Sequence, residues 1–285
     1  MLDNETFQRI SEFVYERSGI VLGPNKAALV RKRVSERMRE LDTTGVREYF
    51  DYVLDEPTGR EAIILLDSIC TNVTSFFRER PHFDALKKHF LQHVELGQTR
   101  FRYWSAACSS GEEACSMAIT LLEAAEEHRI TRLDLKILGT DLSTKILARA
   151  QTASYTAENV SAIPDYLRAK YFTQVSTGTW QAGDRIRELT TFRRMNLAGE
   201  RFPVRGPFDA ILCRNVMIYF SDEVRQQLVS RFERLLGPGG LLMVGHTEGA
   251  GPYVKQLVYA QPSVYQKPGR RTSQCAMRPQ PMEVE

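Results

Sequence analysis

Three acidic residues have the types and the spacing to bind a ligand that carries positive charge and hydroxyl groups. Glu112 and Glu113 begin a predicted helix directly after the small residues 109–111, and Asp141 ends the next predicted strand. A turn between a strand and a helix exposes backbone N–H groups beside a ligand. This turn lacks the GxGxxG pattern and the lysine that are typical of phosphate sites. We therefore expect a ligand that presents hydrogen-bond donors and positive charge rather than a pyrophosphate.

Ordinary helix capping is the alternative explanation of the same acids. Glutamates favour the first turn of a helix whether or not a ligand is present, and Asp141 can cap the helix that follows it. However, a strand, a small-residue turn, a helix and an acid at the end of the next strand occur here in order. Such an acid in a doubly wound sheet can accept hydrogen bonds from both hydroxyls of a ribose. The combination favours a nucleoside ligand.

The elements that must position these acids follow from the hydrophobic pattern after residue 100. Strands are predicted at residues 101–107, 133–141, 191–197, 208–215 and 241–245, with helices between them. This alternation predicts an α/β fold, a parallel sheet with helices on both faces. A closing hairpin at about residues 257–267 fits the Rossmann-like S-adenosylmethionine methyltransferase variant better than the dehydrogenase variant. The ammonium and sulfonium of that cofactor also suit a turn that bears glutamates.

The same pattern divides the chain into three parts. Residues 1–95 show only helical periodicity and form a predicted all-α domain. Residues 96–267 form the predicted methyltransferase domain, interrupted by a small antiparallel insertion at about residues 171–190. Residues 268–285 are rich in Pro, Arg and Gln and are expected to be disordered.

The second helix of the N-terminal domain is basic. Its six cations face only two acids, and Lys26, Arg33 and Arg37 flank one side of its apolar stripe. A solvated helix face is one interpretation of this pattern, and a platform for an acidic partner is the other.

Composition narrows the range of functions further. The 285 residues carry a net charge of +3, which is too mild to indicate nucleic acid. The chain shows neither a run of 18 apolar residues nor a signal-peptide pattern, so we expect a cytoplasmic protein without membrane insertion. Five cysteines without CxxC spacing predict free thiols, with neither a disulfide framework nor a metal site.

A polar segment precedes the predicted methyltransferase domain. Within residues 72–78, Asn72, Thr74 and Arg78 carry polar tips. They could form a capped loop before the helix that starts near Pro81, or one wall of a binding cleft.

Four motifs follow one another along the chain: NVTSFFR at residues 72–78, SAACSSGEE at 105–113, FDAILCRNVMIYF at 208–220 and GHTE at 245–248. Together they resemble the bacterial chemotaxis receptor methyltransferases, the CheR family, over almost the whole chain. Two departures are Thr247, where the family has Ser, and Ala114 with Cys115, where many members carry Pro-Tyr.

The resemblance implies methylation of glutamate side chains on the cytoplasmic signalling helices of chemoreceptors. S-adenosyl-L-methionine would be consumed, and a glutamyl methyl ester and S-adenosyl-L-homocysteine would form. By motif, Glu113 would bind the cofactor's amino group and Asp141 its ribose. The other cofactor contacts that the resemblance implies are Asn72, Thr74, Arg78, Asn196, Leu197, Arg214 and Asn215.

The resemblance also implies partners. Lys26, Arg33 and Arg37 on the basic helix would face the acidic receptor helix. The antiparallel insertion would match a subdomain that, in some members, docks a peptide at the receptor's C-terminus, and the sequence leaves open whether it does so here.

The implied reaction makes modest chemical demands. A glutamate has a pKa of roughly 4.3, so it is already an anionic nucleophile near neutral pH. We expect Arg78 or Tyr219 to orient the substrate carboxylate and assign no catalytic base. The alternatives are a nucleic-acid or small-molecule methyltransferase, or a non-catalytic module that binds the cofactor or the receptor. The amine-methylating Asn/Asp-Pro-Pro-aromatic motif is missing, since residues 213–216 read CRNV.

Overall fold

The computed structural model describes residues 2–70, 72–200 and 202–269. Most of the predicted tail, residues 270–285, lies outside the described residues, and so does Cys275. Within the described part, Cys70, Cys108, Cys115 and Cys213 are free thiols, as the sequence predicts.

The N-terminal domain is a helical bundle with its own core. Its helices are α1 (Asn4–Ser18), α2 (Ala27–Glu40), α3 (Val46–Asp55) and α4 (Arg60–Ile69), and the short turn η1 (Pro24–Lys26) precedes α2. Asp3 caps α1 by accepting a hydrogen bond from the Thr6 N–H at 2.7 Å. Ile10, Val34 and Tyr49 are fully buried between the helices. Their helical spacing is the reason that this segment folds as a bundle.

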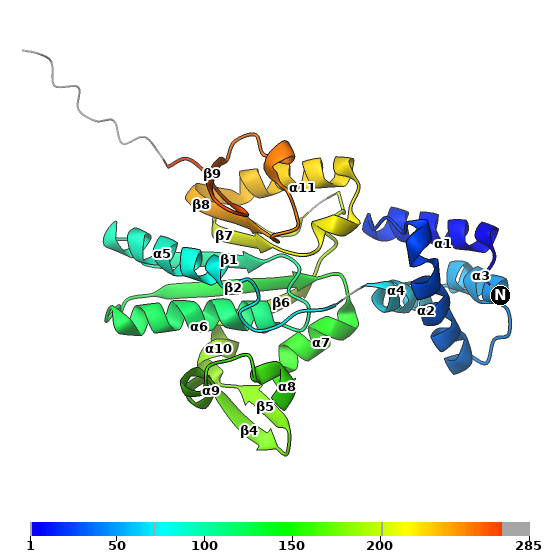
Figure 1. Ribbon diagram of the computed structural model, residues 1–285, viewed down its shortest axis with the longest axis horizontal. Helices are drawn as coiled ribbons and strands as arrows, with labels where there is room; N and C mark the ends of the chain where they lie inside the picture. Colours follow the sequence, from blue (N-terminus) through cyan, green and yellow to red (C-terminus); the bar gives the residue numbers. More distant parts are fainter. Residues whose placement is uncertain (1, 71, 201, 270–285) are drawn as a thin grey trace, which may run out of the picture.

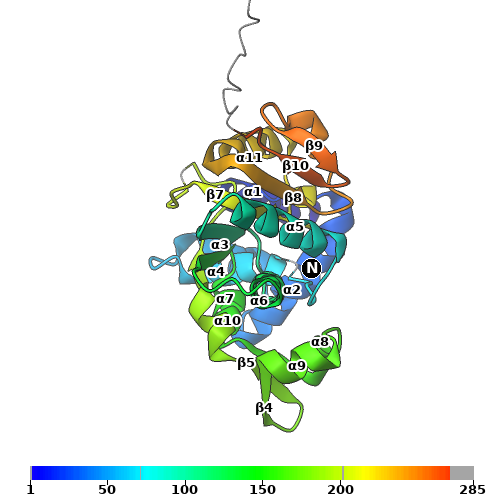
Figure 2. The same ribbon diagram turned by 90° about the vertical axis from the view of Figure 1, so that its left-hand side faces the viewer.

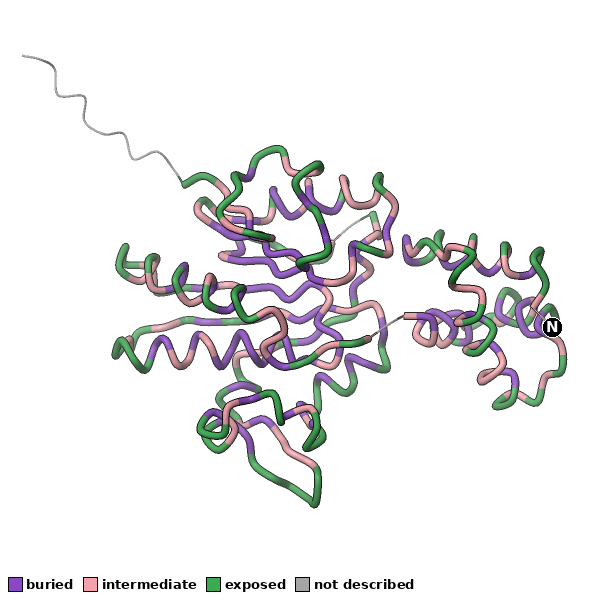
Figure 3. The backbone as a smooth tube through the Cα atoms, viewed as in Figure 1, coloured by how far each residue is buried: buried purple, intermediate pink, exposed green. Residues whose placement is uncertain are grey.

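The second domain contains a seven-stranded sheet, which confirms the predicted α/β fold. Its spatial order is β6 (Thr190–Arg194), β2 (Asp134–Asp141), β1 (Arg100–Ser105), β7 (Phe208–Cys213), β8 (Leu236–Val244), β10 (Val264–Gln266) and β9 (Val258–Gln261). The first five strands are parallel, and the closing hairpin β9–β10 adds to β8 in antiparallel register. Parallel strands at the centre of a sheet are buried on both faces, and β7 (FDAILC) is accordingly apolar over most of its length, whereas the edge strand β6 (TTFRR) is largely exposed. Figure 3 shows this burial along the central strands.

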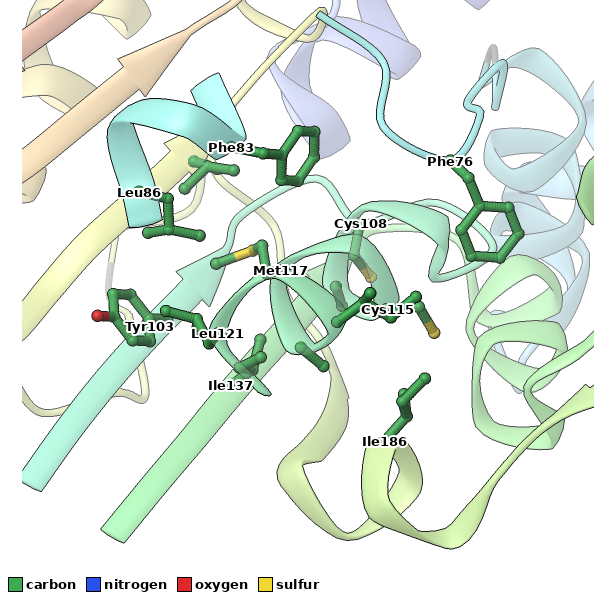
Figure 4. Close-up of a cluster of buried hydrophobic side chains, with 14 of the residues drawn as sticks. Phe76, Phe83, Leu86, Tyr103, Cys108, Cys115, Met117, Leu121, Ile137 and Ile186 are labelled. Carbon is green, nitrogen blue, oxygen red and sulfur yellow. The ribbon is translucent and has the colours of Figure 1, made fainter. Parts of the chain in front are cut away.

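Helices cover both faces of this sheet. They are α5 (Pro81–Glu95), α6 (Glu112–Glu127), α7 (Thr144–Thr152) and α11 (Asp222–Leu235). On one face, α5 and α6 pack against Tyr103 and Ile137 (Figure 4). Helix α5 therefore belongs to this domain and not to the N-terminal all-α domain, which the sequence predicted to extend to residue 95. On the other face, Trp104 meets Phe232 of α11 with 5.4 Å between ring centroids.

The antiparallel insertion is larger than predicted. Its sheet has three strands, in the order β3 (Ser154–Thr156), β5 (Thr179–Ala182) and β4 (Phe172–Ser176), and it carries α8 (Ala157–Val160) and α9 (Asp165–Tyr171). The prediction of an insertion confined to about residues 171–190 missed β3, which is too short to show an alternating pattern. Part of the predicted antiparallel range is helical, because Ile186 and Leu189 lie on helix α10 (Asp184–Leu189), where Ile186 is fully buried.

The helical domain covers the ends of the parallel strands where the turns carry the predicted ligand-binding residues (Figures 1 and 2). The Val21 N–H donates to the Tyr219 carbonyl at 2.8 Å, and Asn196 donates to the Arg17 carbonyl at 2.9 Å. Gly19 ends α1 with a φ of 72°, and a Cβ there would lie only 2.4 Å from the Ala198 Cβ. Glycine therefore allows both the left-handed turn and the close contact between domains. Among the described residues, we find no helix with the length and hydropathy of a membrane span.

Candidate functional site

A cavity lies between the helical domain and the turns that follow β1, β2, β6 and β7. It contains about 860 Å³ of space free of protein atoms, its open mouth included, which is within the range of small-molecule sites. All nine residues expected to contact a cofactor line it: Asn72, Thr74, Arg78, Glu113, Asp141, Asn196, Leu197, Arg214 and Asn215. Tyr219 lines it as well. The structure thus brings together residues that are up to 143 positions apart in the sequence (215 − 72).

Glu113 forms a negatively charged part of the cavity wall. It lies in the first turn of α6, after Gly111, whose φ of 95° lets the chain turn sharply out of β1. Its carboxylate accepts hydrogen bonds from the Ser105 hydroxyl at 2.6 Å and from Arg214 at 3.0 Å. Burial raises the pKa of Glu113, although Arg214 and Ser105 oppose that rise. A buried carboxylate whose charge is only partly compensated favours a cationic ligand such as an ammonium.

Asp141 is held at the end of β2 by two backbone groups. One carboxylate oxygen accepts from the Ser109 N–H at 2.9 Å, and the other accepts from the Ser143 N–H at 3.0 Å. Burial raises the pKa of Asp141, and these N–H groups oppose the rise. The N-cap of α7 is Ser143 rather than Asp141, because the Ser143 hydroxyl accepts a hydrogen bond from the Ile146 N–H. Each Asp141 oxygen keeps a lone pair that can accept from a ligand hydroxyl.

The end of the cavity near β6 is lined mainly by apolar side chains. Leu142, Met195 and Leu197 line it, together with Ile20 from the helical domain. The Asn196 side chain accepts from the Ala198 N–H at 3.0 Å while it donates to Arg17, so it fixes the turn against α1. Such a wall suits the faces of an aromatic base.

The segment of residues 72–78 forms a wall of the cavity, which favours the cleft interpretation over the plain capped loop. The Phe77 N–H donates to the Ser116 hydroxyl at 3.0 Å, and the Ser109 hydroxyl donates to the Asn72 carbonyl at 3.0 Å. Phe76 is buried beside α6 (Figure 4). Its ring packs edge-on against Tyr155 of the insertion, with 4.9 Å between centroids. These contacts fix the linker between the two domains to the cofactor turn.

Arg214 lies at the centre of a buried ionic network that the sequence did not reveal. Its side chain is 2 % exposed and contacts Glu113 at 3.0 Å and Glu79 at 3.2 Å. It also donates to the Arg78 carbonyl. Glu248 of the GHTE motif accepts from the backbone N–H groups of Asn215 at 2.6 Å and Gly245 at 2.7 Å, so it holds the turn that carries Arg214 and Asn215.

The predicted receptor-facing cations have different surroundings. Lys26 lies beside the cavity, with its ammonium 6.0 Å from the centre of the Tyr219 ring. Arg33 is partly exposed and pairs with Glu36 at 3.2 Å. Arg37 instead makes two 2.7 Å hydrogen bonds to Glu61, which is 3 % exposed. Arg37 therefore ties α2 to α4.

Sequence reasoning missed several residues at the site. Ile20, Leu142 and Met195 line the cavity but carry no polar signal that could have identified them. Glu79 directly follows the NVTSFFR motif, and Glu248 lies within a quoted motif, so both were visible as acids at motif positions. Only the fold shows that each is turned inward.

Comparisons with known proteins match both domains of the chain to the same family. A model of the CheR methyltransferase SAM-binding domain matches residues 72–260, and a model of the CheR methyltransferase all-alpha domain matches residues 5–70. A chemotaxis protein methyltransferase of Borreliella burgdorferi is 34% identical over 93% of this chain and 95% of its own length. One of Escherichia coli is 34% identical over 93% and 91%. Chemotaxis protein methyltransferase 2 of Pseudomonas aeruginosa is 37% identical over 86% of each chain.

Proposed function

The chain belongs to the CheR methyltransferase family, and on that premise we propose that it methylates glutamate side chains on the cytoplasmic signalling helices of chemoreceptors. It is an S-adenosylmethionine-dependent enzyme. The observation that carries the proposal is the single cavity in which a buried carboxylate, a strand-end carboxylate and an apolar wall follow one another.

The lining residues fit S-adenosylmethionine group by group. Glu113 would accept from the ammonium, since it is buried and only partly neutralised. Asp141 would accept from the ribose hydroxyls through the lone pairs that its backbone contacts leave free. Leu197 and its apolar neighbours would enclose the adenine. Asn72 and Thr74 would contact the cofactor from the linker, while Arg214 and Asn215 would lie at its methionine end.

Positioning and exclusion of water are the tasks that remain for the protein. Bound S-adenosylmethionine supplies a methyl group on a positively charged sulfur, and a substrate glutamate supplies an anion at neutral pH. Because opposite charges are lost as the ester forms, a cavity that excludes water favours the transition state. Arg78 and Tyr219 lie at the cavity and would orient the incoming carboxylate. No proton needs to be removed, so the site requires no general base.

Three proposals concern partners and location. Lys26 presents charge near the cavity, and Arg33 presents a partly exposed charge on α2. Both would attract the acidic receptor helix, whereas Arg37 is largely occupied by Glu61. The exposed strand β4 could bind a C-terminal receptor peptide at the edge of its sheet. A substrate on the cytoplasmic side of receptors places the enzyme in the cytoplasm.

The test is transfer of labelled methyl groups from S-adenosylmethionine to chemoreceptor cytoplasmic fragments. We expect label that mild base releases as methanol, which is the signature of a carboxyl methyl ester. Fragments with and without their C-terminal peptide would show whether β4 contributes. Label that resists base, or that appears only in added RNA, would contradict the proposal. The Asp141→Asn variant is the control for cofactor-dependent transfer.

A further inference from the structure

One guanidinium in the cavity wall serves two carboxylates. Arg214 contacts Glu113 at 3.0 Å through one nitrogen and Glu79 at 3.2 and 3.3 Å through its other two. All three side chains are shielded from solvent, with exposed fractions of 2 % for Arg214, 10 % for Glu113 and 14 % for Glu79. Glu113 and Tyr219 line the cavity, whereas Glu79 lies behind Arg214, outside the lining.

The pKa values of the two carboxyl groups are shifted in opposite directions. Burial acts to raise the pKa of Glu79, but Arg214 and the His246 N–H bring it below its ordinary value. For Glu113, burial prevails and the pKa is raised; the Glu79 charge adds to that rise and Arg214 opposes it. Arg214 therefore pairs with both carboxylates, and its single positive charge does not balance two negative ones. If Glu79 lost its charge, the charge of Arg214 would balance that of Glu113 alone.

Glu79 is also held in place from several sides. Its backbone has a φ of 56°, which is unusual for a residue other than glycine. Its carboxylate accepts from the His246 N–H at 3.3 Å and from the Asn215 side chain at 3.4 Å. The Arg214 guanidinium lies 3.2 Å from this carboxylate, and the His82 Nδ1 lies 3.4 Å from it. A residue held in a strained conformation by its surroundings often has a functional task.

We propose that Glu79 is a positioning residue that shares Arg214 with Glu113, so that the two carboxylates and one guanidinium keep a net negative charge toward the amino group of the cofactor. The inference rests on the proposed binding of S-adenosylmethionine in this cavity. It assigns Glu79 no contact with the cofactor or the substrate. Its effect is confined to the amino group of the ligand, so it can be measured as the contribution of that group to the affinity.

The experiment compares two ligands by calorimetry: S-adenosylhomocysteine and its analogue in which hydrogen replaces the α-amino group. The ratio of their dissociation constants measures how much the amino group contributes. In the Glu79→Gln variant we expect this ratio to fall about tenfold, or about 1.4 kcal/mol. The reason is that Arg214 would then balance the charge of Glu113 and the cluster would have no net negative charge. Glu79→Asp keeps the charge but shortens its reach, and we expect an intermediate fall.

Glu233→Gln is the matched control, because Glu233 is 2 % exposed and caps the backbone N–H groups of Lys255 and Gln256 on the far side of α11. It should leave the ratio unchanged. A general loss of stability would weaken both ligands equally, so the ratio separates positioning from structure. An unchanged ratio in folded Glu79→Gln protein would overturn this inference and leave the proposed function intact. Failure of the unaltered protein to bind S-adenosylhomocysteine would overturn the proposed function with it.

Discussion

The cavity wall and the basic helix α2 use charge in opposite ways. At the cavity, Glu113 and Asp141 are fixed by hydrogen bonds of 2.6–3.0 Å to groups of the same domain. On α2, Arg31 and Lys32 are exposed, Arg33 is half-exposed, and Arg37 alone is anchored inward. Fixed, desolvated charges give specificity for a small ligand, whereas exposed charges attract a large partner weakly and at a distance. The four predictions below test this difference.

The largest effect is expected at Asp141. Replacement by Ala would remove the acceptor for two ribose hydroxyls and leave the Ser109 and Ser143 N–H groups without their partner. We expect binding of S-adenosylhomocysteine to weaken about 100-fold or more, at about 1.5–3 kcal/mol for each hydrogen bond to a charged group. Calorimetry measures this directly. Asp134→Asn, at the exposed start of the same strand, should leave the affinity unchanged. A loss of similar size in both variants would contradict the assigned site.

Arg37 should behave as a structural residue, although it lies on the basic helix. Arg37→Met would leave Glu61 buried without its main partner, and we expect the free energy of unfolding to fall by about 3 kcal/mol in urea. Arg33→Met, on the same helix, should change it by less than about 0.5 kcal/mol. Equal stabilities of the two variants would show that Arg37 is simply another surface cation.

Acid should destabilise the methyltransferase domain through His82. Burial, and then the nearby Arg214, lower the pKa of His82 to about 4, although the Glu79 carboxylate, 3.4 Å from the His82 Nδ1, acts in the opposite direction. Neither ring nitrogen makes a hydrogen bond among the described residues. Because the unfolded chain binds a proton near pH 6.5, stability should fall as the pH drops from about 6.5 to 4. The contribution of His82 is roughly 2–3 kcal/mol at the acid end. The pKa of His89 is lowered to about 4 in the same way, so that residue adds to the effect.

The His82→Gln variant isolates this contribution. Its stability, measured by urea unfolding at several pH values, should depend less steeply on pH than that of the unaltered protein. His128→Gln, at an exposed position, is the control and should keep the original slope. An unchanged slope in His82→Gln would mean that folding does not shift the pKa of His82, which would contradict this prediction.

The smallest effect is expected at the partly exposed cations Lys26, which ends η1, and Arg33 of α2. Charge reversal of Lys26 and Arg33 together should slow receptor methylation roughly three- to fivefold and leave the affinity for S-adenosylhomocysteine unchanged. The difference should shrink at high salt, because exposed charges are screened. Arg31→Glu, elsewhere on the helix, tests whether position matters. If it slowed the reaction equally, α2 would act only through its net charge.

The contrast between the two regions also explains what the sequence could predict. The cavity residues belong to contiguous motifs at the ends of strands, and parallel strands bring such ends together. Asp141 and Glu113 could therefore be placed in one site before the fold was known. Their roles as cofactor contacts stay predictions until a ligand is measured.

Contacts between residues that are far apart in the chain could not be predicted from the sequence. Arg37 and Arg33 are indistinguishable in a helical pattern, because the buried partner Glu61 lies 24 residues away on another helix. Nothing in the sequence marks Glu79 as a buried partner, and its inward position depends on Arg214 and His246, which follow β7 and β8. Strand β3 was missed because three residues carry too little pattern, and its pairing with β5 depends on a segment about 25 residues further on.

A crystal structure of the complex with S-adenosylhomocysteine tests the central claim most directly. We predict that both ribose hydroxyls lie within hydrogen-bond distance of the Asp141 carboxylate, with the ligand's ammonium at Glu113 and its adenine between Leu142 and Leu197. A ligand bound outside this cavity, or one whose ribose faced away from Asp141, would contradict the account.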